Sequence, residues 1–179
     1  MKTKLFLFLL ICSVFAGCNK KNDPTQITIS EDLLKSYFPY QNGDRLTFFN
    51  DLMGNVNYTV LESSFRKEEG KMIVTVNMTG ANYKGEQLYF ILLDAVVENE
   101  HVLTINYRQS LQESSQTNSL PSAYAVPKST NGSFTYDAET GSELPKTITL
   151  SDGSIIKQNE GLTYFIDYDS EKWYFKKRL

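Results

Sequence analysis

The chain has 179 residues, of which 41% are hydrophobic and 22% are charged, and its formal net charge is −3 at pH 7. This slight acidic excess argues against nucleic acid as a partner, because nucleic-acid binding needs a clustered basic face. With two cysteines and one histidine, the chain has little material for a disulfide framework, a zinc site or a nucleophilic triad. We therefore predict no metal, no cofactor and no nucleic-acid partner.

The first 18 residues have the pattern of an export signal. Lysines precede an apolar run of about a dozen residues, which is shorter than the ~20 residues that a membrane-spanning helix needs. The run ends on the small residues Ala16 and Gly17, and Cys18 follows at once before a polar stretch. A charged start, a short apolar centre and small residues at the end predict a signal peptide over residues 1–17.

The stretch Phe15-Ala16-Gly17-Cys18 resembles the lipobox of bacterial lipoproteins, in which diacylglycerol is joined to the cysteine thiol and the chain is cut before the cysteine. The resemblance implies lipidation at Cys18. It also implies recognition by the signal peptidase through Phe15, Ala16 and Gly17, although Leu is commoner than Phe at the first position. More than one acyl chain makes such an anchor stable. Asn19 rather than Asp follows the cysteine, so we expect a lipid-anchored protein of the cell envelope, in the outer membrane. The alternative is an ordinary secretory signal.

Residues 18–29 predict a lipidated tether, because Lys, Asn, Asp, Pro and Thr dominate them. A single β-rich domain is predicted over 30–179, and it opens with one short helix. Ser30 suits the N-cap, the acidic residues after it suit the positive end of the helix dipole, and Pro39 prevents continuation. The apolar side of this helix is formed at helical spacing by Leu33, Leu34, Tyr37 and Phe38.

From residue 42 onward the pattern changes to short alternating runs separated by turn residues such as "KEEG" and Asn99-Glu100. Over residues 71–79, apolar side chains fall on one face and polar ones on the other, as in a half-buried antiparallel strand. Residues 86–99 are apolar on both faces, which predicts a central strand or one covered by the helix. The fold class is therefore mainly β, a single antiparallel meander that forms a barrel or a sandwich, with one short N-terminal helix.

Residues 110–132 interrupt this alternation of apolar and polar residues with Ser, Gln, Asn and Pro, and we predict a long loop there. Loops beyond ~15 residues are uncommon in compact domains and are often functional. Tyr124 lies in this stretch between Pro121 and Pro127. Its ring either pins the loop to the barrel or forms an exposed contact, and these three residues are our candidate binding loop.

No catalytic residue is predicted. His101 follows a turn, and no motif supplies a nucleophile beside it. Carboxylates are the better enzymatic candidates, since glycosidases use a pair that lies roughly 5–9 Å apart. Pairs that are close in the sequence are Glu98 with Glu100, Glu139 with Glu143, and Asp167 with Asp169. Acidic residues beside turns are also typical of the solvated surface of a β protein, and we favour that interpretation.

Two stretches, "YFPYQNGDRLTFFN" at 37–50 and "GLTYFIDYDSEKWYFKK" at 161–177, resemble the entry and the closing hairpin of small lipoproteins common in Bacteroidetes. The resemblance covers these stretches alone and rests on turn and core residues, so no site residue is carried over. A lipid anchor and a meander also invite comparison with lipocalins. That comparison is one of architecture, because Leu46 follows Gly43-Asp44-Arg45 where lipocalins have Gly-x-Trp.

The sequence thus predicts a lipid-anchored envelope protein with a non-enzymatic binding or interaction module. Its partners would be the membrane, through Cys18, and a small molecule, a glycan or an envelope protein. One alternative is a carboxylate-dependent enzyme acting on glycans. Another is a structural subunit of an outer-membrane complex.

Overall fold

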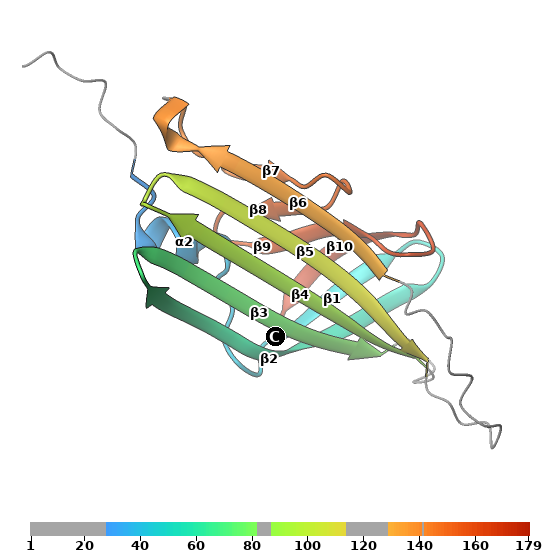
Figure 1. Ribbon diagram of the computed structural model, residues 1–179. Helices are drawn as coiled ribbons and strands as arrows, with labels where there is room; N and C mark the ends of the chain where they lie inside the picture. The colour runs from blue at the N-terminus through green and yellow to red at the C-terminus, as the bar shows by residue number, and fades with distance from the viewer. Residues whose placement is uncertain (1–27, 82–86, 114–128, 141) are drawn as a thin grey trace, which may run out of the picture.

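The computed structural model describes residues 28–81, 87–113, 129–140 and 142–179. Over these residues the chain is mainly β. Ten antiparallel strands form one sheet that curls until it nearly closes into a barrel, and a single α-helix lies at one end (Figure 1). The predicted fold class, a mainly β antiparallel meander with one short N-terminal helix, is confirmed, and the barrel is the form observed.

The helix α2 (Glu31–Tyr37) precedes every described strand. In chain order the strands are β1 (Arg45–Asn50), β2 (Gly54–Glu68), β3 (Lys71–Ala81), β4 (Gln87–Glu98), β5 (Val102–Glu113), β6 (Ser129–Asp137), β7 (Thr147–Thr149), β8 (Ile155–Lys157), β9 (Gly161–Ile166) and β10 (Lys172–Arg178). Their order across the sheet is β6-β5-β4-β3-β2-β1-β10-β9-β8-β7. Neighbours in the sheet are therefore neighbours in the chain, except that β1 pairs with β10 and so joins the first strand to the last.

The barrel closes incompletely between β6 and β7, the two edge strands of the sheet. The short helix η1 (Ala138–Thr140) lies between them in the chain. Across this seam Ser151 N donates to Ser133 O at 2.9 Å, and Ser133 N donates to Ser151 Oγ at 3.0 Å. In the part of the chain that the structure describes, this serine pair takes the place of a ladder of backbone hydrogen bonds.

Helix α2 covers one end of the barrel, as Figure 1 shows. The Ser30 side chain caps it by accepting a hydrogen bond from Leu33 N at 3.1 Å, as the sequence predicts. Leu34 and Tyr37 are fully buried on the side that faces the core. Tyr37 Oη also donates to Pro145 O at 2.8 Å, so the helix is joined to the barrel by both apolar packing and a hydrogen bond.

The predicted hairpin turns are present at the same end as α2. Glu69 and Gly70 have φ of 48° and 78°, and Asn99 and Glu100 have φ of 51° and 65°. Positive φ at both central residues is the mark of the type I′ turn, whose twist matches that of paired strands. Ile29 N donates to Glu100 O at 2.8 Å, which places the start of the described chain beside these turns.

The predicted loop over 110–132 is wrong at both ends. Strand β5 continues to Glu113, and β6 begins at Ser129, which pairs with Ser110. These strand ends are rich in polar residues, so an alternation of apolar residues does not reveal them. Pairing with a neighbouring strand satisfies their backbone groups whatever the side chains are. The prediction for 114–128 lies outside the described residues.

The interior of the barrel changes in character along its axis. Near α2 it is mostly aliphatic, with Leu34 of the helix and Leu103 and Ile105 of β5 fully buried. Farther from α2 the buried residues include the aromatic side chains Phe48, Tyr58, Tyr107, Phe165 and Trp173. The Phe48 ring lies 5.7 Å from that of Tyr58 and 5.0 Å from that of Phe165, both edge to face. This half of the barrel is therefore rich in aromatic rings, and the tyrosines bring polar atoms into it.

Candidate functional site

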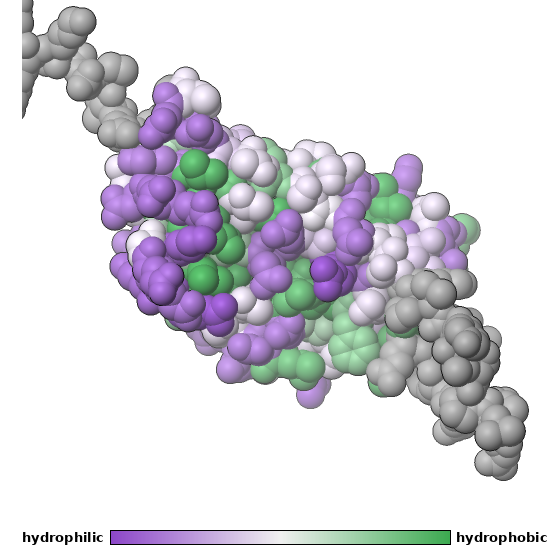
Figure 2. All heavy atoms as spheres, in the orientation of Figure 1, coloured by the Kyte–Doolittle hydropathy of each residue, from purple (hydrophilic) through white to green (hydrophobic). Residues whose placement is uncertain are grey.

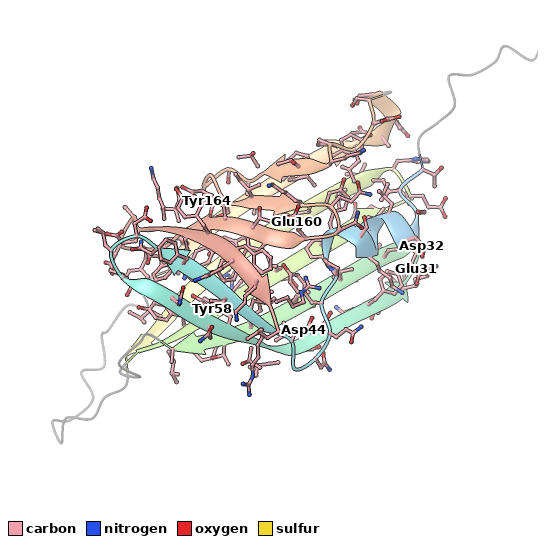
Figure 3. All side chains as sticks on the ribbon, turned by 180° about the vertical axis from the view of Figure 1, so that it is seen from behind. Glu31, Asp32, Asp44, Tyr58, Glu160 and Tyr164 are labelled. Carbon is pink, nitrogen blue, oxygen red and sulfur yellow. The ribbon has the colours of Figure 1, made fainter. Side chains whose placement is uncertain are left out.

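Four polar side chains meet inside the barrel in the half away from α2, and we call this cluster the polar end. Tyr107 and Gln109 are two residues apart on β5 and both point inward. Thr130 of β6 lies opposite Gln109 in the sheet register. From across the barrel, Tyr58 Oη lies 3.3 Å from Gln109 Nε2, which donates to it. Tyr58 is itself buried, and it is labelled in Figure 3.

Among the described residues, three buried atoms of the polar end find no hydrogen-bond partner: Tyr107 Oη, Gln109 Oε1 and Thr130 Oγ1. The exposed fraction of both Tyr107 and Gln109 is 1%. Thr130 lies close enough to Tyr107 to lower the pKa of its phenol slightly, but no hydrogen bond of normal geometry joins the two hydroxyls. An unpaired buried polar group costs about 1–3 kcal/mol, so this cluster carries a cost that a bound hydrogen-bonding group removes.

A glycine lets a carboxylate approach the polar end. Gly132 lies opposite Tyr107 in the register between β5 and β6. A Cβ at this position would collide with Asp152 Oδ1. The Asp152 carboxylate is itself held by Ser154, whose backbone N donates to Oδ1 at 3.0 Å and whose Oγ donates to Oδ2 at 2.8 Å. Glycine at 132 therefore makes room for a fixed negative charge beside Tyr107.

The phenols of the polar end are neutral. Burial is the main cause that raises the pKa of Tyr58 and of Tyr107. The carboxylate of Asp167 raises the pKa of both phenols further, and that of Asp152 raises the pKa of Tyr107. Each hydroxyl keeps its proton near neutral pH, so each can donate one hydrogen bond as well as accept.

Asp167 is buried, with an exposed fraction of 5%, so its interpretation as a solvated acidic residue is wrong. Its Oδ1 accepts hydrogen bonds from the backbone N of Asp169 and of Glu171, both at 2.9 Å. Its Oδ2 accepts one from Trp173 Nε1 at 2.9 Å. These donors replace the water that an exposed carboxylate would bind, and they fix the turn between β9 and β10.

The other carboxylates singled out in the sequence lie at the surface. Glu98 forms an ion pair with Lys71 at 2.6 Å, and its sequence neighbour Glu100 is exposed. Glu139 and Glu143 are exposed as well. Within the described ranges, no group of three or more His, Cys, Asp or Glu side chains is arranged to hold a metal ion.

The predicted anchor and the predicted binding loop lie outside the described residues. The structure therefore does not place the lipidation and cleavage residues Phe15, Ala16, Gly17 and Cys18, nor the loop residues Pro121, Tyr124 and Pro127. None of the helices in the described part of the chain is long and apolar enough to cross a membrane.

Sequence reasoning missed Gln109, although a signal for it exists. Leu103, Ile105 and Tyr107 define the inward phase of β5, and Gln109 is the next residue in that phase. A polar residue at an inward position of a strand is a candidate site residue, because burying it is costly without a partner. No sequence pattern indicates that Gln109 lies opposite Thr130, because that placement depends on the register between β5 and β6.

The outer face of β2–β6 carries two shallow hollows. One of about 530 Å³ is bordered by Leu61, Phe90, Leu92 and Arg108, among others. The second, of about 230 Å³, lies over β4, β5 and β6. Figure 2 shows apolar residues interspersed with polar ones on this face.

The chain was compared with known protein families, with curated proteins and with solved structures, and none of the three comparisons gave a match.

Proposed function

We propose that this protein is a lipid-anchored binding module of the cell envelope that holds a small hydroxyl- or amide-bearing ligand at the polar end of its barrel. The proposal rests on three buried atoms, on Tyr107, Gln109 and Thr130, that no described residue hydrogen-bonds. Gln109 Oε1 only accepts hydrogen bonds, so the ligand must bring at least one donor. The two hydroxyls donate or accept as the ligand requires.

The aromatic surroundings support a ligand with an apolar body. Tyr107 lies 6.4 Å from Phe165, and Phe165 stacks on Trp173 at 6.2 Å, measured between ring centroids. Sites for small molecules combine apolar and aromatic walls with a few polar groups that fix orientation. The polar end has this composition.

The carboxylates near the polar end support binding over catalysis. Both oxygens of Asp167 accept hydrogen bonds from protein N–H groups, and both oxygens of Asp152 accept from Ser154. A general acid or base must have its oxygen directed at the substrate. These two carboxylates instead hold turns, so the glycan-active enzyme is the less favoured alternative.

The anchor gives the binding module an orientation. The described chain starts beside α2, at the end of the barrel away from the polar end. The stretch from Cys18 to Thr28 spans at most about 35 Å when extended. A lipid on Cys18 would therefore hold the α2 end toward the membrane and leave the polar end directed away from it.

The anchoring part of the proposal is tested by Cys18→Ala in the full chain. We expect the variant to accumulate as an uncleaved precursor or to move from the detergent-extracted membrane fraction to the soluble fraction. Normal cleavage together with retention in the membrane would show that Cys18 is not the lipid acceptor.

The binding part is tested by thermal unfolding of the full chain with N-acetylglucosamine, glycerol and benzamide at millimolar concentration. A ligand that binds the folded state alone raises the unfolding midpoint, and the rise increases with the logarithm of the ligand concentration above its Kd. We expect at least one probe to raise the midpoint of the wild type and to lose this effect with Gln109→Leu combined with Thr130→Val. If none of the probes raises the midpoint, the polar end is not a site for this class of ligand.

The outer face of β2–β5 favours a second candidate function, that of a subunit in an envelope complex. Leu61 is 56% exposed there, in the hollow that Phe90 and Arg108 also border. Exposed apolar residues beside charged ones are typical of protein interfaces. Cross-linking in intact envelopes should join this face to one defined protein, and Leu61→Asp should remove that product.

A further inference from the structure

A row of large side chains crosses the outer face of the barrel on the side opposite β3–β5. Phe49 of β1 lies opposite Tyr174 of β10, and Tyr174 lies opposite Tyr164 of β9. Tyr164 in turn lies opposite Ile155 of β8. Neighbouring strands are about 4.8 Å apart, so these four side chains form a row roughly 15 Å long. We call it the outer row.

The centre of the outer row is the floor of a hollow. Tyr164 and Tyr174 line this hollow of about 510 Å³, with their ring centroids 5.1 Å apart and their planes inclined by 50°. Tyr174 is 46% exposed. Ligand pockets measure roughly 300–1,000 Å³ and have aromatic walls with a few polar groups, so the size and lining of this hollow suit a ligand.

Hydrogen-bonding groups border the aromatic floor. Lys157, Glu160 and Thr163 line the hollow together with the tyrosines, and Figure 3 shows the face that carries Tyr164 and Glu160. The hydroxyls of Tyr164 and Tyr174 add groups that can both donate and accept hydrogen bonds. Burial raises the pKa of Tyr164, so its phenol is neutral. The hollow therefore offers both donors and acceptors.

The charges of the hollow indicate a neutral ligand. The ammonium group of Lys157 and the carboxylate of Glu160 are the charged groups in its lining, and they carry opposite signs. A charged ligand would be attracted by one of these groups and repelled by the other. A neutral ligand with hydroxyl groups can bond to both.

The strands beneath the hollow exclude one common way of binding a peptide. Strand β9 is paired with β8 and β10, and β10 is paired with β9 and β1, so neither presents a free edge to an added strand. A stable protein partner also buries about 800 Å² on each side, which is far more surface than this lining provides. The hollow is suited to a single unit of a smaller molecule.

We propose that this hollow binds a neutral saccharide, with one sugar ring stacked on Tyr174 and neighbouring units laid along the outer row. Tyrosine presents a flat apolar face and a polar hydroxyl, which matches a sugar ring with its apolar C–H face and its hydroxyl edge. Lys157, Glu160 and Thr163 hydrogen-bond to the sugar hydroxyls. The site is separate from the polar end, because the outer row points outward and the polar end inward.

The test is a titration of the full chain with three soluble oligosaccharides, chitohexaose, maltohexaose and cellohexaose, followed by saturation-transfer NMR and calorimetry. We expect at least one of them to bind, and Tyr174→Ala to weaken that binding by about tenfold or more. Tyr174→Phe keeps the ring and should retain most of the affinity. Leu88→Ala removes an exposed apolar side chain of β4 on the opposite face and should leave the affinity unchanged.

Two results would overturn the proposal. One is that none of the three oligosaccharides binds at millimolar concentration. The other is that Tyr174→Ala binds as well as the wild type while its circular dichroism shows a folded barrel. Because Tyr174 is about half exposed and lies outside the core, we expect this variant to fold. Binding that is lost with Gln109→Leu but kept with Tyr174→Ala would assign the sugar to the polar end instead.

Discussion

At the α2 end of the barrel, Tyr37 Oη donates to Pro145 O, and the first turn of the helix is capped by Ser30. At the other end, Tyr107 is buried to the same degree, yet no residue of the described ranges hydrogen-bonds its Oη. Both ends bury a tyrosine, but among the described residues the hydroxyl of Tyr37 is hydrogen-bonded and that of Tyr107 is not. Natural proteins tolerate such a local cost where a site needs it, which is why the unpaired end is the better place to look for binding.

To test this comparison, the largest change in the free energy of unfolding is expected from Leu34→Ala at the α2 end. Leu34 is fully buried between the helix and the barrel, so its truncation should lower the free energy of unfolding by about 2–5 kcal/mol. Urea unfolding of the full chain measures it. Leu52→Ala is the matched control, because Leu52 is 85% exposed and its truncation should change stability by less than about 0.5 kcal/mol. A small loss with Leu34→Ala would mean that α2 is not part of the folded core.

Alkaline pH should destabilise the protein through Tyr40, which follows α2. Burial raises the pKa of Tyr40 to about 12, and its Oη accepts a hydrogen bond from Leu162 N at 2.6 Å. A raised folded-state pKa means that the stabilisation is complete below about pH 10 and is lost as the pH rises toward 12. The expected loss from this residue is about 2–3 kcal/mol.

Urea unfolding of wild type and Tyr40→Phe across this alkaline range measures the effect. The variant starts with lower stability, because Leu162 N loses its acceptor. Its stability should nevertheless fall less steeply with pH, since one titrating phenol is absent. Equal slopes would show that Tyr40 is not the group that titrates.

A smaller effect is expected from Ser30→Ala. Removing the Oγ that accepts from Leu33 N should lower the free energy of unfolding by about 1 kcal/mol. Ser30→Asp retains an acceptor at the N-cap and serves as the control. If Ser30→Asp loses as much stability as Ser30→Ala, the hydrogen bond to Leu33 N is not the cause.

Sequence reasoning succeeded where structure is determined locally. The cap at Ser30, the stop at Pro39 and the turn at Asn99-Glu100 depend on a few consecutive residues, and the alternating runs predicted the central strands. It failed at Asp167, whose burial depends on N–H groups that a folded turn brings to it. It also failed at the ends of the predicted loop, where Glu113 and Ser129 are held by neighbouring strands.

Neither candidate site was predictable as a site, for a similar reason. The polar end needs Thr130 opposite Gln109, and the outer row needs Tyr174 between Phe49 and Tyr164. Each arrangement is set by the register between paired strands, and the pairing of Phe49 with Tyr174 also joins strands from opposite ends of the described chain. A one-residue shift of register would move every side chain of a strand to the other face, so composition alone does not place them.

The smallest change in stability is expected from Tyr107→Phe, and this variant tests the comparison most directly. It removes a buried hydroxyl that has no partner in the described part of the chain, so the free energy of unfolding should stay the same or rise by up to about 1 kcal/mol. The same chemical change at the α2 end, Tyr37→Phe, leaves Pro145 O without its donor and should cost about 1 kcal/mol. Urea unfolding of both variants should show a loss of stability for Tyr37→Phe and no loss, or a gain, for Tyr107→Phe if the two ends differ as described. A loss of about 2 kcal/mol or more with Tyr107→Phe would mean that its hydroxyl is satisfied within the folded protein. The polar end would then lack the unmet hydrogen-bonding capacity on which its role in binding rests.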